Sequence, residues 1–376
     1  MKRIAIIALA LLAVSQTFAQ KAAPFGSIDY VEGSAIVVRS GKSLGEANIG
    51  DDVLPDDMIK TAADGLVVIA LDRSTGMRGT LTIKSKSVAY IRLTPDAAGA
   101  KSTIEMVAGQ LSSKLAKLSG NPTLQVQTDS VVRGVRGTQF SIAGSVNGSV
   151  LVVCTEGAVA CTDGGEPVSV PAGKAVEKKA GERLKLVPVA ISSAEQFEKR
   201  WIADEIEAFK GNAVRALADY EKRYTDYMAR FNEAFAPLQR SEVLSKWIRE
   251  DAAGVVPSAG DATTLREKKA IAGDILATRK VLFIFERLYY RIVELDQYVM
   301  GTTLEKAELR AGLTVGDFVR RVRSDAPALE KRVFLFRYAE KLYEQRNSGG
   351  AGLPGMSAPG AGSEDDFFGS SDDWDF

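Results

Sequence analysis

The spacing of apolar residues divides the chain near residue 190. Before that point, short β-branched and aliphatic stretches alternate with Gly, Asp, Asn and Pro, a pattern typical of strands joined by tight turns. Many short strands of this kind predict a sandwich, a barrel or a short solenoid. The clearest strands are expected over residues 34–39, 66–71, 80–83, 88–93, 103–107, 124–127, 139–143, 150–154 and 158–161.

After residue 190 the apolar residues recur at helical spacing. Ser192 or Ser193 can begin the first helix, with an acid or amide three residues later completing a capping box. Aromatic residues run along the predicted helices, and we expect them to form the core of an antiparallel bundle. The predicted helices run from this cap to Pro237, over 241–250, over 264–300, from Val315, and from Pro327 to about Gln345.

The first 19 residues have the features of a secretory signal peptide. Lys2 and Arg3 precede an apolar run over 4–14 and a small-residue cleavage site ending at Ala19. The run is about half of the ~20 residues that span a bilayer, and an uncleaved membrane anchor is the alternative. We expect a periplasmic or exported mature chain without a transmembrane span.

The other end of the chain is polar and acidic. Residues 347–362 consist mainly of Gly, Ala, Ser and Pro, which predicts a disordered linker. Nothing basic follows Arg346, and acids alternate with aromatic residues at the very end. Two interpretations stay open, a docking peptide that orders on a partner and a solvated tail with incidental aromatics. The aromatic residues concerned are Phe367, Phe368, Trp374 and Phe376.

Composition narrows the classes of function. Lysine and arginine together number 48, as do aspartate and glutamate, so net charge gives no reason to expect a nucleic-acid partner. Histidine is absent, which removes the commonest general base and metal ligand. We therefore expect no metal and no cofactor. A pair of carboxylates remains open as catalytic chemistry.

The most informative motif is the block over 132–140, in which two arginines and two glycines recur at a spacing of three. It resembles the VRGTxF signature of the FecR domain, a bacterial envelope module. Segments over 31–33, 49–61, 109–111, 126–128, 150–159 and 171–173 resemble other parts of that family in the right order, so the resemblance covers about 27–175. The signature residues are Arg133, Gly134, Arg136, Gly137, Thr138 and Phe140.

This resemblance implies an all-β, non-catalytic periplasmic module. Family members with full regulatory architecture add a cytoplasmic anti-sigma region, one membrane span and a partner-binding domain, and this sequence departs from that plan at both ends. Gly134 and Gly137 are expected where φ is positive or backbones approach closely. Arg133 and Arg136 are candidates for binding an anionic group, and the interpretation that we favour is that Arg136 pairs internally with a carboxylate and holds the turn.

Two further groups of residues are candidate sites. Four acids lack the spacing of a known calcium loop and are expected to form turns, and they are Asp51, Asp52, Asp56 and Asp57. Cys154 and Cys161 flank a six-residue segment. If this segment forms a hairpin that turns at 157–158, the cysteines lie opposite each other, and an exported protein then favours a disulfide. Two free core thiols are the alternative.

The expected organisation is a signal peptide over 1–19, a FecR-like β domain over 26–190, a helical bundle over 191–346 and an acidic-aromatic tail over 347–376. The expected function is non-enzymatic interaction or scaffolding in the cell envelope, with an envelope protein or a cell-wall glycan as partner. The alternative is a sensor or regulator that relays a signal to a membrane partner. A carbohydrate-active enzyme is the least supported class.

Overall fold

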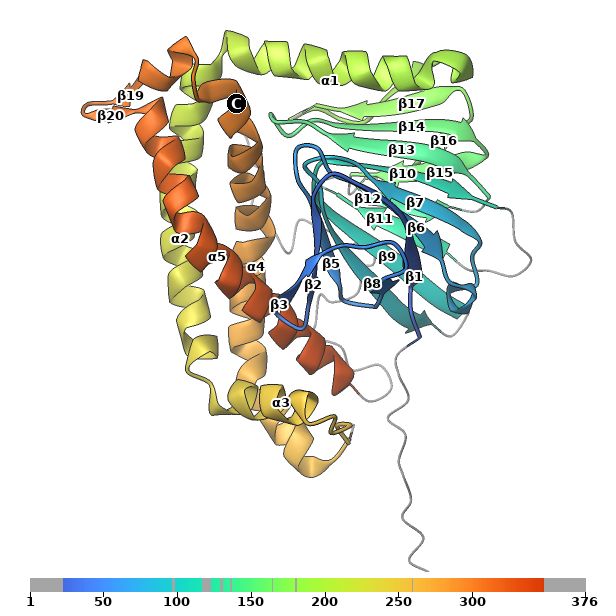
Figure 1. Ribbon diagram of the computed structural model, residues 1–376, viewed down its shortest axis with the longest axis vertical. Helices are drawn as coiled ribbons and strands as arrows, with labels where there is room; N and C mark the ends of the chain where they lie inside the picture. The colour runs from blue at the N-terminus through green and yellow to red at the C-terminus, as the bar shows by residue number, and fades with distance from the viewer. Residues whose placement is uncertain are drawn as a thin grey trace, which may run out of the picture.

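Figure 1 shows the computed structural model of the chain, in which two β-sheets lie beside a group of long helices. The structure describes residues 23–96, 99–116, 123–128, 131–135, 137–163, 165–179, 181–258 and 260–347. We call residues 23–190 the β part and residues 191–347 the helical part. The architecture changes where the spacing of apolar residues changes, so this feature of the fold was predicted correctly.

Within the described residues the β part has two nine-stranded sheets. Sheet A contains, in spatial order, β18 (Lys185–Pro188), β17 (Lys174–Lys178), β14 (Val150–Glu156), β13 (Gln139–Gly144), β10 (Gln110–Leu115), β7 (Gly79–Ile83), β6 (Leu66–Leu71), β1 (Gly26–Glu32) and β4 (Asp52–Val53). Sheet B contains β16 (Val168–Pro171), β15 (Ala158–Thr162), β12 (Val131–Val135), β11 (Thr123–Gln127), β9 (Gly99–Ala108), β8 (Val88–Asp96), β5 (Met58–Thr61), β2 (Ala35–Arg39) and β3 (Lys42–Glu46).

All nine predicted strands are present, and the sequence missed others of two kinds. Some are short edge strands such as β3, whose five residues, Leu44 included, are all exposed, so no buried apolar position marks them. Others, such as β17, have only two buried residues between charged ones, so their apolar run is too short to stand out.

Both faces of sheet B are buried. Alternate residues of a strand point to opposite sides of the sheet, and on β8 both sets of residues pack into a core. On β8, Ala89 and Ile91 belong to the core between the two sheets. Val88 and Tyr90 belong instead to a core made mostly by the helices. Strands buried on both faces appear in the sequence as continuous apolar runs, and residues 88–91 form such a run.

The helical part contains five α-helices among the described residues. They are α1 (Ala194–Gly211), α2 (Ala213–Gln239), α3 (Glu242–Ala252), α4 (Ala262–Val299) and α5 (Val315–Gln345). Short 3-10 turns cover Arg73–Thr75, Ile191–Ser193 and Thr303–Lys306, and β19 (Glu308–Arg310) pairs with β20 (Leu313–Thr314).

Three predictions about the helices are wrong. The capping box at the start of α1 is absent, because a 3-10 turn precedes the helix and Ser193 makes no capping hydrogen bond. The first predicted helix is two helices, α1 and α2, because the weak helix formers Gly211 and Asn212 separate them. Pro327 lies inside α5 instead of starting a helix, because Val322 and Leu329 are buried on either side of it.

The helical part contacts both sheets, as Figure 1 shows. Helix α1 lies along the β14 and β17 end of sheet A, where Trp201 packs on Leu151 and Val153 and donates a 2.7 Å hydrogen bond to Glu177. Helices α4 and α5 cover the outer face of sheet B, where they share a core with Val38 and other residues of the β part. No helix in the described ranges has the length and apolarity that crossing a membrane requires.

Candidate functional site

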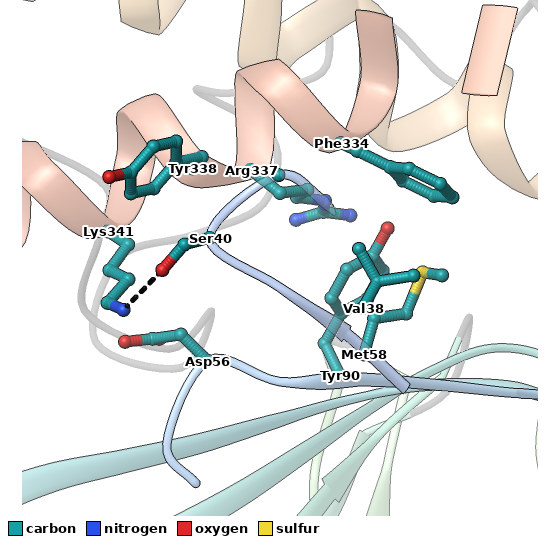
Figure 2. A pocket seen from close by; sticks show the side chains of 10 residues that line it. Val38, Ser40, Asp56, Met58, Tyr90, Phe334, Arg337, Tyr338 and Lys341 are labelled. Carbon is teal, nitrogen blue, oxygen red and sulfur yellow. Dashed lines mark hydrogen bonds between the residues drawn. The ribbon is translucent and has the colours of Figure 1, made fainter. Parts of the chain in front are cut away.

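A small cavity lies between the outer face of sheet B and helix α5, and Figure 2 shows its lining. Its volume is about 20 Å³, which is room for about one water molecule. Ligand pockets are usually many times larger, so we treat this cavity as part of a contact surface between the two parts of the chain. The β part supplies Val38, Ser40, Gly41, Asp56, Met58 and Tyr90, and α5 supplies Phe334, Arg337, Tyr338 and Lys341.

The turns of the β part that face the helices carry strained backbone. Among the described residues, Ser40, Asp56 and Lys86 are the non-glycine residues with positive φ, at 50°, 68° and 55°. Ser40 accepts a 3.1 Å hydrogen bond from Lys341, Asp56 lines the cavity, and the ammonium of Lys86 lies 5.8 Å from the ring centre of Tyr298. Such strain persists only where surrounding contacts hold it, so these turns are shaped by the helices.

A buried charge cluster lies beside the cavity. It contains four arginines and four glutamates, so its formal charges cancel. Sheet B supplies Arg92 and Glu105, α4 supplies Arg279, Glu286 and Arg287, and α5 supplies Arg337, Glu340 and Glu344. We refer to these eight residues as the charge cluster.

Arg337 lies at the centre of the charge cluster. Its guanidinium is 3.1 Å from the Glu105 carboxylate and 3.3 Å from that of Glu340, and it also binds Glu286. Arg92 of sheet B reaches Glu340 at 3.4 Å. The side chains of Glu286 and Glu340 are 0% and 1% exposed, so these ion pairs are shielded from solvent.

Tyr90 joins the charge cluster to the apolar core. Its hydroxyl donates a 2.6 Å hydrogen bond to Glu286 on α4. The guanidinium of Arg337 lies 4.3 Å from the centre of its ring, which is cation–π geometry. Two helices and one strand therefore meet at a single buried phenol.

The pKa values follow from burial and from the neighbouring charges. Burial alone would raise the pKa of Glu105, but the guanidinium groups around it, Arg337 first, lower it well below the ordinary value. Burial raises the pKa of Glu344 to about 7, against the opposing effect of Arg92. Burial also raises the pKa of Asp56. Glu344 at the edge of the cluster therefore titrates near neutrality, whereas Glu105 and Arg337 stay ionised.

This arrangement couples the β part to the helical part. A buried charge that loses its partner is costly, so each side of the cluster is stable only while the other side is in place. A change of position in α5 must then change the environment of Arg92 and Glu105 in sheet B. The chemistry available here is charge pairing and, at Glu344, proton binding.

The signature block lies elsewhere, in the link between sheets B and A. Arg133 and Gly134 belong to β12, and Arg136 lies outside the described residues. Gly137 has a φ of 59°, as expected for a glycine of this block. Thr138 and Phe140 are 1% and 2% exposed, so both lie in the interior of the β part.

The expected hairpin between the two cysteines is wrong. Cys154 lies on β14 of sheet A and Cys161 on β15 of sheet B, because the chain changes sheets at Gly157. The two residues therefore are not cross-strand neighbours. Both are buried and free in the structure. The disulfide between them stays a prediction.

The acidic turn over 51–57 is held by the protein itself. The carboxylate of Asp57 accepts hydrogen bonds from Arg39 at 2.8 and 2.6 Å and from the backbone of Leu54 at 2.7 Å. Asp51 accepts one from the backbone of Asn48 at 2.8 Å. In the described ranges no group of three or more His, Cys, Asp or Glu side chains is placed to hold a metal ion. The tail aromatics over 367–376 lie outside the described residues.

Sequence reasoning missed the charge cluster, although a signal was present. Arg92 and Glu105 each interrupt an apolar strand at a position that a strand with one solvated face would expose. The sequence alone therefore predicts that each is a surface residue, because the local pattern does not show that helices cover that face. Their hydrogen-bond partners on α5 are 232 to 252 positions away, which no local pattern indicates.

Comparison with solved structures finds two crystal structures of a candidate anti-sigma factor from Parabacteroides distasonis. The first has 11% sequence identity and a TM-score of 0.31, and the match covers 37% of this chain and 63% of the other. The second has 11% identity and a TM-score of 0.25, covering 44% and 62%. The match thus spans less than two thirds of either structure.

No curated protein matches the chain. A protein-family model does match, and it places the matching segment within the β part, from the start of β5 to the middle of β15. This segment includes the signature block and Cys154, and it ends one residue before Cys161. Residues 57–160 match the family described as FecR protein, which confirms the resemblance that the signature block and its flanking motifs indicate.

Proposed function

We propose that this chain is a non-enzymatic regulator of the bacterial cell envelope that relays the binding of a partner from one part of the chain to the other. The match to the FecR family supports the regulatory class over the scaffolding role that the sequence first suggested. The observation that carries the relay is the charge cluster, in which Arg92 and Glu105 of sheet B form ion pairs with four residues of α4 and α5, namely Arg287, Arg337, Glu340 and Glu344.

The relay has a physical basis in the cluster, because each part of the chain supplies counter-charges for the buried charges of the other part. A partner that moves α5 separates Arg337 from Glu105, and this leaves a buried carboxylate without its main counter-charge. Sheet B then has to rearrange, or the partner has to supply the missing charge. A signal received on the helices in this way reaches the FecR segment.

Location in the envelope is part of the proposal. It rests on the basic and apolar start of the sequence, and mass spectrometry of the native protein tests it. The expected mature chain begins near Gln20. An intact Met1 in the envelope fraction would contradict export by signal cleavage.

Gene-expression profiling combined with pull-down tests the function. Cells that lack the chain should change the expression of a small set of genes, and the wild-type gene should restore it. A chain with Arg337→Gln that still folds should bind its membrane partner and fail to restore expression. As a matched control, Arg320→Gln removes an arginine that α5 exposes to solvent, and it should restore expression fully.

The results separate the regulator from its alternatives. Only murein or polysaccharide in the eluate, with unchanged expression in the deletion strain, would support a scaffold or glycan-binding module and reject regulation. Restoration by Arg337→Gln as complete as that by the wild type would reject the relay.

A further inference from the structure

Three of the large apolar side chains that the described chain exposes lie at the connection from α3 to α4. Val255, Val256 and Leu265 are 52%, 78% and 51% exposed. Leu265 lies in the first turn of α4, and the two valines precede that helix. Gathered apolar side chains on a surface are typical of a binding site.

Unpaired basic side chains accompany these apolar residues. Arg249 on α3 and Arg266 and Lys269 on α4 are exposed, and within the described chain none has an ionic partner. Nearby acids are already engaged. Glu267 binds a lysine and a tryptophan of α3, and Asp261 caps α4. We call the three apolar and three basic residues together the α3–α4 corner.

The described chain ends beside this corner. Arg346 pairs with Glu250 of α3 at 2.8 Å, and its guanidinium lies 4.4 Å from the ring centre of Trp247. Asn347 accepts a hydrogen bond from Lys268 of α4. Figure 1 accordingly shows the end of α5 next to α3. Whatever follows residue 347 therefore leaves the protein next to the corner.

The last 13 residues have the complementary chemistry. Residues 364–376 contain six acids, four aromatic residues and no base. Residues 348–363 precede them, and a coil of these 16 residues spans about 20 Å. That reach is sufficient to return the tail to the corner. Such a tether also raises the effective concentration to the millimolar range, so weak contacts suffice.

We propose that the acidic-aromatic tail, residues 364–376, docks on the α3–α4 corner of its own chain. Its aromatic side chains cover Val255, Val256 and Leu265, and its carboxylates pair with the three free bases. A docked tail is withheld from other proteins, so the corner regulates its availability. The docking does not depend on the identity of any partner.

Tryptophan fluorescence of the full chain tests this docking. Trp201 and Trp247 are 7% and 0% exposed, so quenching by acrylamide reports mainly on Trp374, the third tryptophan of the sequence. The signal of Trp374 is the difference between the wild type and Trp374→Phe. We expect it to be quenched less in the chain than in the synthetic peptide 364–376. The protection should fall in 1 M salt, where exposed charges are screened beyond about 3 Å.

Charge reversal locates the site. Arg266→Glu with Lys269→Glu should abolish the protection of Trp374, and Val255→Ser with Val256→Ser should reduce it. Arg215→Glu with Lys222→Glu is the matched control, because these α2 residues are also exposed and without an ionic partner in the described chain. This control should keep the protection.

Three results would overturn the proposal. Quenching of Trp374 in the wild-type chain equal to that of the peptide would mean that the tail does not dock. Protection that survives charge reversal at the corner would place the tail elsewhere. Protection that rises with protein concentration would mean that the tail binds a second copy instead of its own chain.

Discussion

The hydroxyl of Tyr90 on β8 donates a 2.6 Å hydrogen bond to the carboxylate of Glu286 on α4, and both side chains are almost completely buried. Tyr290, on the next turn of the same helix, has a buried hydroxyl without a hydrogen-bond partner. These two phenols provide a matched pair for measuring what the interface contributes to stability.

We predict opposite effects for the two tyrosines. Tyr90→Phe removes a hydrogen bond to a buried carboxylate and should lower the free energy of unfolding by about 1.5–3 kcal/mol. Tyr290→Phe removes an unpaired hydroxyl and should be neutral or stabilising. Urea unfolding measures both changes. Equal destabilisation by the two variants would contradict a specific role for the Tyr90–Glu286 hydrogen bond.

The centre of the charge cluster should be more sensitive than any surface ion pair. Arg337→Met leaves buried carboxylates uncompensated and should destabilise the fold by about 3–5 kcal/mol. Arg320→Met, on the same helix, breaks pairs with Glu305 and Asp317 at an arginine that is 51% exposed, and should cost about 0–1 kcal/mol. A small change at Arg337, measured by the same unfolding curves, would show that water enters the cluster.

Elements with strong local sequence patterns were predicted correctly, whereas contacts between distant parts of the chain were not. The strand over 88–93 and the helix over 264–300 were predicted because their patterns are local and strong. The continuity of α5 through Pro327 was not predicted, because it depends on buried neighbours that the local sequence does not show. The contact between Tyr90 and Glu286 spans 196 positions, and no periodicity encodes such a pairing.

The candidate sites also divide into residues that a local motif indicates and residues whose role depends on distant contacts. Gly137 was identified correctly as a position of positive φ, because a glycine motif carries that information locally. Arg92 and Arg337 belong to no motif, and their role follows from the docking of α5 on sheet B.

Stability should depend on pH through two carboxyl groups, that of Glu344 at the edge of the cluster and that of Glu294 on α4. Burial raises the pKa of Glu344 and of Glu294 to about 7, so the folded chain holds these protons more tightly than the unfolded chain. Their contribution is present in full below about pH 4.5 and is lost as the pH rises to about 7. Unfolding free energies measured between these values should fall with pH, and Glu344→Gln should flatten the curve.

Glu195 supplies the control for this pH dependence. It is an exposed acid whose pKa is lowered by its hydrogen bond to Lys199, so Glu195→Gln should leave the slope above pH 4.5 unchanged. Glu105 also titrates below that window, because its pKa is lowered. If the slopes of Glu344→Gln and Glu195→Gln are the same, the carboxyl of Glu344 titrates near its ordinary value.

The signature block can be tested through its backbone. Gly137 has a φ of 59°, a backbone conformation that residues with a side chain rarely adopt. Its carbonyl oxygen also lies 2.7 Å from the position that a Cβ atom at Gly157 would occupy, so the backbone is closely packed here. Gly137→Val should therefore destabilise the chain by about 1–3 kcal/mol. Gly273→Val, in the middle of α4 with open space around it, should have little effect. An unchanged melting temperature in Gly137→Val, together with lost partner binding, would move this motif from fold to function.

The two cysteines test the crossing between sheets. Cys154 and Cys161 lie on strands of different sheets in one core, and burial raises the pKa of both thiols, that of Cys161 to about 12. Because the thiolate is the reactive form, neither should react with a thiol reagent in the native protein at neutral pH. Unfolding without reductant should then release two thiols, and Cys161→Ser should release one. If the unfolded protein releases no thiol until it is reduced, the cysteines form a disulfide between the sheets, and the two strands lie closer together at the crossing near Gly157 than in this structure.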